Sequence, residues 1–121
     1  MEDAVSEIVS ITMRAFENDD RQAALQVDPL EEVIDDLCDE LKSRHIARVG
    51  RQECTLEQGF VFNDILTDFE RISDHCTNVA VDILESAGNE FLSHEYHQSL
   101  EYRENDLFRK YFSEYKEKYA L

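Results

Sequence analysis

The stretch from Thr55 to Gly88 constrains the fold most, because its apolar residues recur every three or four positions along its whole length. On a helical wheel they lie within roughly 40° of one direction. They are Ile65, Phe69, Ile72, Cys76, Val79 and Ile83. The stretch opens with Thr55-Leu56-Glu57-Gln58, a pattern typical of a capping box. We therefore expect one helix, about 50 Å long at 1.5 Å per residue, with these residues buried.

Two segments before Thr55 have the same helical spacing. The first carries its apolar face on Val5, Ile8, Val9, Thr12, Ala15 and Phe16, and we expect it to end in the polar cluster Glu17–Asp20. The second carries its apolar face on Leu30, Ile34, Leu37, Leu41, His45 and Val49, with Gly50 as a plausible stop.

The start of the second helix has two interpretations. Asp28-Pro29-Leu30-Glu31 combines a good N-cap, a proline at the first helical position and a Glu that can close a capping box. Alternatively, the helix begins near Asp20 and kinks at Pro29.

The last third of the chain is less regular. Residues 89–105 are mixed and polar, which predicts a loop with at most one helical turn. Aromatic side chains then return at helical offsets, at Phe108, Tyr111, Phe112, Tyr115 and Tyr119. With one Pro and three Gly in 121 residues, the sequence predicts an all-α fold. We expect one domain over residues 1–121: an antiparallel three-helix bundle with an additional C-terminal helix.

Charge and cysteine usage narrow the function classes. The chain has 28 Asp and Glu against 12 Lys and Arg, a net charge of −16. This balance argues against binding nucleic acid or anionic lipid, which both need a surplus of cations. No apolar run approaches the about 20 residues of a membrane span. Cys38, Cys54 and Cys76 form no CxxC pair, and three free thiols suit a reducing cytoplasm.

Two carboxylate pairs stand four residues apart, Glu31 with Asp35 and Glu70 with Asp74. Residues so spaced lie above one another on a helix, so two neighbouring helices could bring four carboxylates to one patch. Oxygen-rich clusters suit hard or borderline cations. The alternative is a solvated acidic face, since such pairs arise by chance among 28 acids.

Evidence for an enzyme is weak. His94-Glu95-Tyr96-His97 fails the HExxH pattern because its histidines are three residues apart, and we expect it in a surface loop. No phosphate-binding glycine motif or nucleophile–base pair occurs, and Cys76 falls on the buried stripe, where thiols are usually inert.

A longer run carries a family resemblance. Leu66-Thr67-Asp68-Phe69-Glu70-Arg71-Ile72-Ser73-Asp74-His75-Cys76-Thr77-Asn78-Val79-Ala80 resembles the signature helix of the PhoU family, and Pro29–Leu37 resembles its acidic helix. Ser43–Ile46, Phe69–Val81 and Tyr115–Leu121 are similar, more narrowly, to the C-terminal PhoU-like domain of bacterial sodium/phosphate cotransporters. The resemblance is good over residues 20–88 and in the last seven residues.

The resemblance implies a bundle fold, a role in phosphate signalling and uptake, and paired acidic motifs that hold metal clusters. Iron, zinc or magnesium would then be bound by Glu31, Asp35, Glu70 and Asp74. Arg71, His75 and Asn78 match the signature and are candidates to cap, pair with or orient those carboxylates.

The chain has room for about one bundle, whereas the family normally has two. We therefore expect a soluble cytoplasmic fragment of a larger sodium-dependent phosphate transporter, which regulates uptake at the inner face of the membrane. Its expected partners are the membrane-embedded portion of that transporter and a second copy, in a homodimer that supplies the second bundle. The alternative is an acidic helical interaction module with no metal site.

Overall fold

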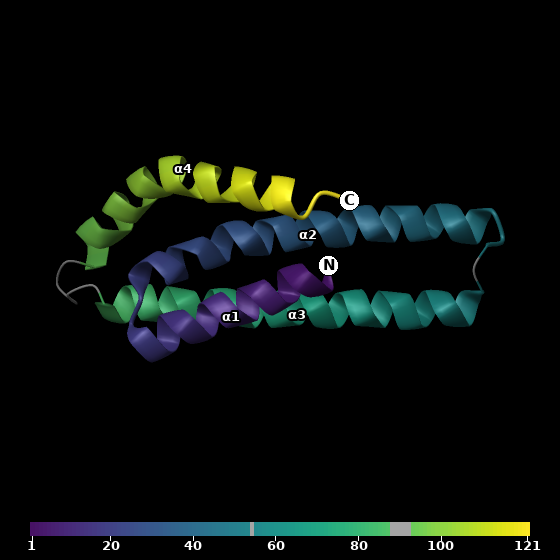
Figure 1. Cartoon of the computed structure of the whole chain (residues 1–121), viewed down its shortest axis with the longest axis horizontal. Helices are drawn as coiled ribbons and strands as arrows, with labels where there is room; N and C mark the ends of the chain where they lie inside the picture. Colours follow the sequence, from purple (N-terminus) through teal and green to yellow (C-terminus); the bar gives the residue numbers. More distant parts are fainter. Residues whose placement is uncertain (54, 88–92) are drawn as a thin grey trace.

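The fold consists of helices alone in the part of the chain that the computed structural model describes, residues 1–53, 55–87 and 93–121. The helices are α1 (Glu2–Asn18), α2 (Arg21–Gly50), α3 (Leu56–Ala87) and α4 (Ser93–Lys118). The long helices α2 and α3 form an antiparallel hairpin, α1 lies beside one end of it, and α4 runs back along α2 (Figure 1). The predicted three-helix bundle with an additional C-terminal helix is confirmed. No helix of these ranges is long and apolar enough to cross a membrane.

Asp20 sets the start of α2. Its carboxylate accepts hydrogen bonds from the backbone N–H groups of Gln22 and Ala23, at 3.1 and 3.2 Å, as an N-cap does. Helix α2 then continues through Pro29, which is buried. The predicted start at Asp28 is therefore wrong, and the alternative start near Asp20 is confirmed.

The predicted start of α3 is confirmed by its hydrogen bonds. The Thr55 hydroxyl oxygen accepts from the Gln58 N–H, and the Gln58 side chain accepts from the Thr55 N–H, both at 3.1 Å. This reciprocal pair is the expected capping box.

Helix α4 begins earlier than the sequence predicts. Its backbone is helical from Ser93, so the predicted loop over residues 89–105 is wrong for residues 93–105. The stretch His94–His97 thus belongs to a helix rather than a surface loop. Residues 88–92 and the side chains of residues 86–105 lie outside the described part. A polar segment without periodicity can be helical when a longer helix includes it, because many polar residues tolerate helix at little cost.

The hydrophobic core lies where α1, α2 and α3 run together. Among its members, Ile8, Leu30 and Ile34 are fully enclosed. Two residues of the predicted α1 face are not: Val9 and Phe16 are exposed, Phe16 by 68%. The buried side of α1 is narrower than the sequence predicts because α1 packs on two helices and its outer flank has no neighbour in the described chain.

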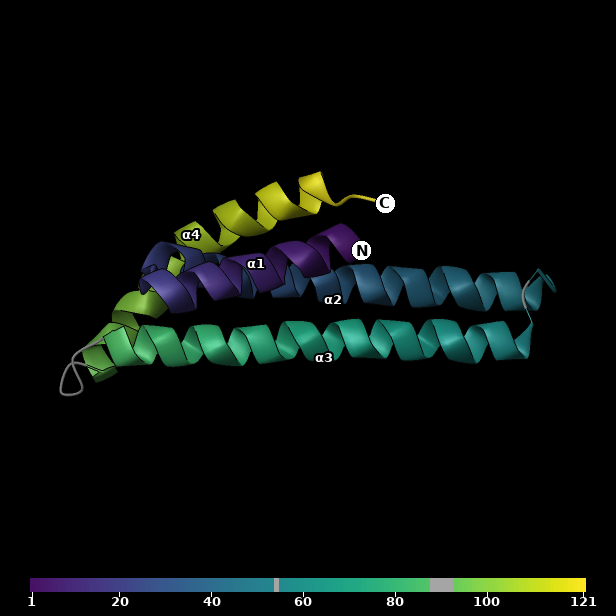
Figure 2. The same cartoon turned by 60° about the horizontal axis from the view of Figure 1, so that its bottom comes forward.

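The core extends along the α2–α3 hairpin only as far as the N-terminal end of α1 (Figure 1). Helix α1 has 17 residues, whereas α2 has 30 and α3 has 32, so at 1.5 Å per residue α1 spans only about half of the hairpin. Beyond it the two long helices continue alone (Figures 1 and 2). We call residues 41–53 and 55–65 the arm and the rest of the described chain the body. No residue of the arm is buried.

The predicted stripe on α3 crosses this boundary. Cys76 and Ile83 are buried as expected, but Ile65 and Ile72 are 46% and 38% exposed. The prediction is therefore wrong for Ile65 and Ile72. Phe69 and Val79, the other two members, are partly buried. The pattern is helical throughout, but the stripe is covered unevenly.

Candidate metal centre

Three of the four predicted metal-binding carboxylates lie together on one face of the hairpin. Because α2 and α3 are antiparallel, Glu31 and Asp35 on α2 lie level with Asp74 on α3. One carboxylate oxygen from each of the three lies within 4.8 Å of the other two. Oxygen ligands around one cation are separated by about 4–5 Å at most, twice a usual metal–oxygen distance. The spacing therefore fits a single ion.

The cluster holds more negative charge than its surroundings favour. Burial raises the pKa of Glu31 to about 8, and the hydrogen bond and charge of Asp35 add to the rise. Burial also raises the pKa of Asp35, with further contributions from the charges of Asp74 and Glu70. At neutral pH the Glu31–Asp35 pair therefore retains a proton between its two carboxylates. A cation bound there would reduce the repulsion between the carboxylates, as the retained proton does.

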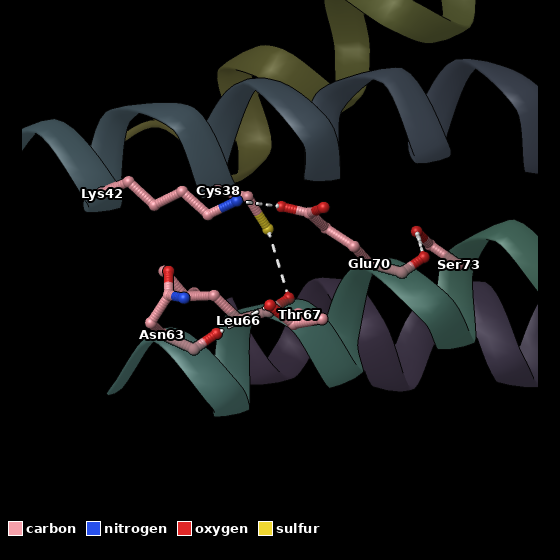
Figure 3. A network of polar contacts seen from close by, with 7 residues as sticks. All are labelled: Cys38, Lys42, Asn63, Leu66, Thr67, Glu70 and Ser73. Atoms are coloured by element: carbon pink, nitrogen blue, oxygen red, sulfur yellow. Dashed lines mark hydrogen bonds and ion pairs between the residues drawn. The ribbon is translucent and has the colours of Figure 1, made fainter. Parts of the chain in front are cut away.

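Glu70, the fourth predicted ligand, has a different partner. The Lys42 ammonium donates to its Oε1 at 2.8 Å, and both side chains are about one-third exposed (Figure 3). Sequence reasoning missed Lys42, although a signal was present. Lys42 follows Asp35 by seven residues, two helical turns, and so lies on the same face of α2 as the cluster.

Cys38 lies beneath the Lys42–Glu70 pair. Its thiol is fully buried, 4.0 Å from the carbonyl oxygen of Leu66 (Figure 3). Burial raises its pKa to about 12, and the charge of Glu70 adds to the effect. A thiol in this state is a packing group and does not supply a thiolate ligand.

The three other signature residues lie on the exposed side of α3. Arg71, His75 and Asn78 are all exposed, and no hydrogen bond or ion pair joins their side chains to any described residue. Their suggested role in orienting the carboxylates stays a prediction, since nothing in the described chain connects them to the cluster.

The donor set is made of oxygen atoms alone. It suits magnesium, manganese or iron better than zinc, whose protein sites usually include nitrogen or sulfur ligands. His75 directly follows Asp74 in sequence, but it is exposed and absent from the group of possible ligands.

Comparison with known protein families gives a match over most of the chain. The family model described as PhoU domain matches residues 1–83, which include α1, α2 and all four predicted carboxylate ligands on α2 and α3. Comparisons with curated proteins and with solved structures gave no match.

Proposed function

Since the chain belongs to the PhoU family, we propose that it is the cytoplasmic regulatory domain of a sodium-dependent phosphate transporter. The family is regulatory and non-catalytic, and its domain indicates a phosphate-related role. The observation that carries the proposal is the match over residues 1–83, together with the signature run Leu66–Ala80 on α3. The similarity of Ser43–Ile46 and Tyr115–Leu121 to the cotransporter domain supports the narrower assignment.

In this proposal the domain acts through protein contacts, and a metal adjusts its shape. Glu31, Asp35 and Asp74 would hold the ion, which would supply positive charge between α2 and α3. Those carboxylates come from both long helices, so a bound cation would strengthen the hairpin near its middle. Lys42 limits the site to three carboxylates as long as it holds Glu70.

The metal part of the proposal is tested by thermal unfolding of chelator-stripped protein, with Mg²⁺, Mn²⁺, Zn²⁺ or iron added. We expect a saturable rise in the unfolding temperature with an ion that prefers oxygen ligands. At a metal concentration of 10–100 times the Kd, the free energy of unfolding should increase by about 1–3 kcal/mol. Asp74→Asn should abolish the rise. Asp82→Asn, which removes an exposed carboxylate from the same helix outside the cluster, is the matched control and should retain it.

Two results would contradict the metal part: an equal rise in wild type and Asp74→Asn, or shifts that disappear in moderate salt as simple screening does. Elemental analysis of the untreated protein gives an independent count of bound ions.

The transport part needs a separate measurement. Phosphate uptake should be followed in cells that carry a sodium/phosphate cotransporter, with the chain supplied or withheld. We expect the uptake rate to change when the chain is present. Unchanged uptake, with the protein expressed and folded, would contradict the regulatory assignment and leave the metal result standing.

A module without metal is the second candidate. The Lys42–Glu70 ion pair favours it, because it neutralises one of the four signature carboxylates with a side chain of the same protein. Here the acids would serve solubility and partner contacts, and Glu70→Gln would lower stability by at most about 1 kcal/mol through loss of a partly exposed ion pair. The three-carboxylate metal site makes the same prediction for Glu70→Gln, because it leaves Glu70 with Lys42. The two candidates are therefore separated by the metal titration, in which the module without metal predicts no saturable rise in wild type.

A further inference from the structure

A groove of about 540 Å³ lies between α2 and the last residues of α4 and the chain. Its floor includes Val33 and Leu37, which are buried, and its other side is formed by residues 119–121. The chain end lies beside α2 at the point where α4 stops running along that helix (Figure 1). The groove therefore has an apolar interior, and its edge at Leu121 is 54% exposed.

This groove is separate from the carboxylate cluster. The two share no residue, although both use α2. At about 100° per residue, the α2 side chains that line the groove point roughly 140° away from Glu31 and Asp35. The groove therefore needs an explanation of its own.

Carboxylates line the α2 side of the groove. Residues 31–40 contain six Asp or Glu and no Lys or Arg, and Asp36, Asp39 and Glu40 of this run line the groove and are exposed. Glu40 is paired with Arg44 at 3.0 Å. Asp36 and Asp39 form no ion pair with any described residue. Two carboxylates beside an apolar floor are thus left for a partner to neutralise.

The α4 side of the groove is held in place by α1. The Lys118 ammonium donates to Oε1 of Glu7 at 2.7 Å, and the Tyr119 hydroxyl donates to the same oxygen. The cation on this side, Lys116, has its Nζ 5.7 Å from the centre of the Phe112 ring. Because these contacts fix the end of α4, a partner does not have to order the groove when it binds.

We propose that this groove binds a basic amphipathic helix of another protein. The apolar face of that helix would lie against Leu37, Tyr119 and Leu121, and its Lys or Arg side chains would reach Asp36 and Asp39. The lining residues of α2 run from 33 to 44, about 17 Å, which matches roughly twelve residues of helix. The partner would cover α2 as α4 does, from the point where α4 ends.

Charge decides between this occupant and others. Nucleic acid and anionic lipid are opposed by the carboxylates of the groove. A second copy is opposed at this groove because each copy has a net charge of −16, whereas the same charge attracts a cationic partner. The inference adds a surface and a partner chemistry to the proposed function. Peptide binding is measured without transport, so either can fail while the other holds.

A synthetic helix provides the test. The probe is a fluorescent peptide of Leu and Lys, about twelve residues long, with Leu at helical spacing on one face. Titrated with the full chain at about 0.15 M salt, it should bind saturably with a micromolar Kd. A scrambled peptide of the same composition, without an apolar face, should bind at least about tenfold more weakly. Absence of saturable binding, or equal binding of the scrambled peptide, would overturn the proposal.

Matched charge variants locate the binding site. Asp36→Asn with Asp39→Asn should raise the peptide Kd at least about fivefold, because both carboxylates beside the groove are lost. Asp64→Asn with Asp68→Asn removes two exposed acids of α3 and changes the net charge equally, so it should raise the Kd by less than about twofold. Equal effects of the two double variants would show attraction to the whole chain instead of binding in the groove.

Matched apolar variants separate this groove from a second one in the arm. Leu121 lines the proposed groove, whereas Leu56 lines the arm groove and is 72% exposed. Leu121→Gln should raise the peptide Kd at least about fivefold, and Leu56→Gln should leave it nearly unchanged. The reverse result would place the peptide in the arm and overturn the proposal. Both positions are exposed, and circular dichroism should confirm that the helices persist.

Discussion

The body and the arm are built from the same two helices, yet they differ in almost every property that follows from packing. In the body, α1 lies against α2 and α3, α4 lies against α2, and Ile34 is completely enclosed. In the arm the same helices continue without a third helix packed between them, and Ile46 is 70% exposed. Helical periodicity is present in both regions. The comparison shows that burial here depends on the length of the neighbouring helix, because α1 is about half as long as the hairpin.

The largest contrast is expected from one substitution made at two places on α2. Ile34→Ala should lower the free energy of unfolding by about 2–5 kcal/mol, because it leaves a cavity in the body. Ile46→Ala should change it by less than about 0.5 kcal/mol in dilute protein, because its side chain is already in water. Urea unfolding measures both. Comparable losses at the two positions would contradict the distinction between body and arm.

A pH effect should arise in the body, at Glu31. The folded chain retains the Glu31 proton up to about pH 8, whereas the unfolded chain releases it near the ordinary pKa of 4.5. Between these values the folded state binds more protons, so stability falls as the pH rises from about 5 to about 8. The lowered pKa of Glu7 acts in the opposite sense, but only below pH 4.5.

Glu31→Gln should therefore flatten the dependence of the unfolding temperature on pH over that range, without added metal. Glu57→Gln removes an exposed arm carboxylate and is the control, which should keep the wild-type slope. A slope that is unchanged in Glu31→Gln would show that the cluster is not the source.

A smaller effect should follow loss of a contact that joins α4 to the body. The Tyr115 hydroxyl donates to the Gln26 side chain at 3.0 Å, and Tyr115 is buried. Tyr115→Phe should cost about 1 kcal/mol, the usual net value of one hydrogen bond. Tyr111→Phe serves as the comparison, since no described residue accepts a hydrogen bond from Tyr111. Equal effects would mean that the Tyr115–Gln26 bond contributes nothing specific.

The smallest changes in stability are expected from Gly→Ala substitutions at two glycines of the hairpin, Gly50 and Gly59, which should respond differently. A Cβ at Gly50 would meet nothing within 4 Å, so Gly50→Ala should stabilise the protein by up to about 1 kcal/mol through helix propensity. A Cβ at Gly59 would lie 2.8 Å from Nε2 of His45, whose ring packs on Phe62 at 4.9 Å. Gly59→Ala must displace that ring and should gain nothing.

In a His45→Ala background the same Gly59→Ala change should become stabilising, because the obstructing ring is gone. Thermal unfolding of the four variants gives the coupling between the two positions. Additive effects would contradict the close approach of His45 to Gly59.

Sequence reasoning predicted the order of the helices, the span of α3 and the ends of α1 and α2, but not the early start of α4 or which parts of the helices would be covered. Asp20 and Asp28 are both good N-caps, and only packing in the body, where Pro29 is buried, decides between them. Ile65 and Ile72 fit the helical pattern as well as Cys76 does, but the pattern does not show where α1 ends.

Three members of the carboxylate cluster were predictable from the sequence, but the separate ion pair of Glu70 was not. Spacing alone places Glu31 with Asp35 and indicates the facing acids of α3. Glu70 pairs with Lys42 rather than joining the cluster because of how α2 and α3 are aligned. No local sequence pattern encodes that alignment. The contact from Lys118 to Glu7, between the two ends of the chain, is of this non-local kind as well.

Hydrogen exchange along α2 tests the central claim most directly, because one continuous helix crosses from body to arm. In protein dilute enough to be monomeric, the amides of residues 30–38 should exchange only through global unfolding. The amides of residues 45–50 should exchange at least about 100-fold faster, through local opening of the uncovered arm. Equal protection along the whole of α2 would show that the arm is as stably packed as the body and would contradict the account.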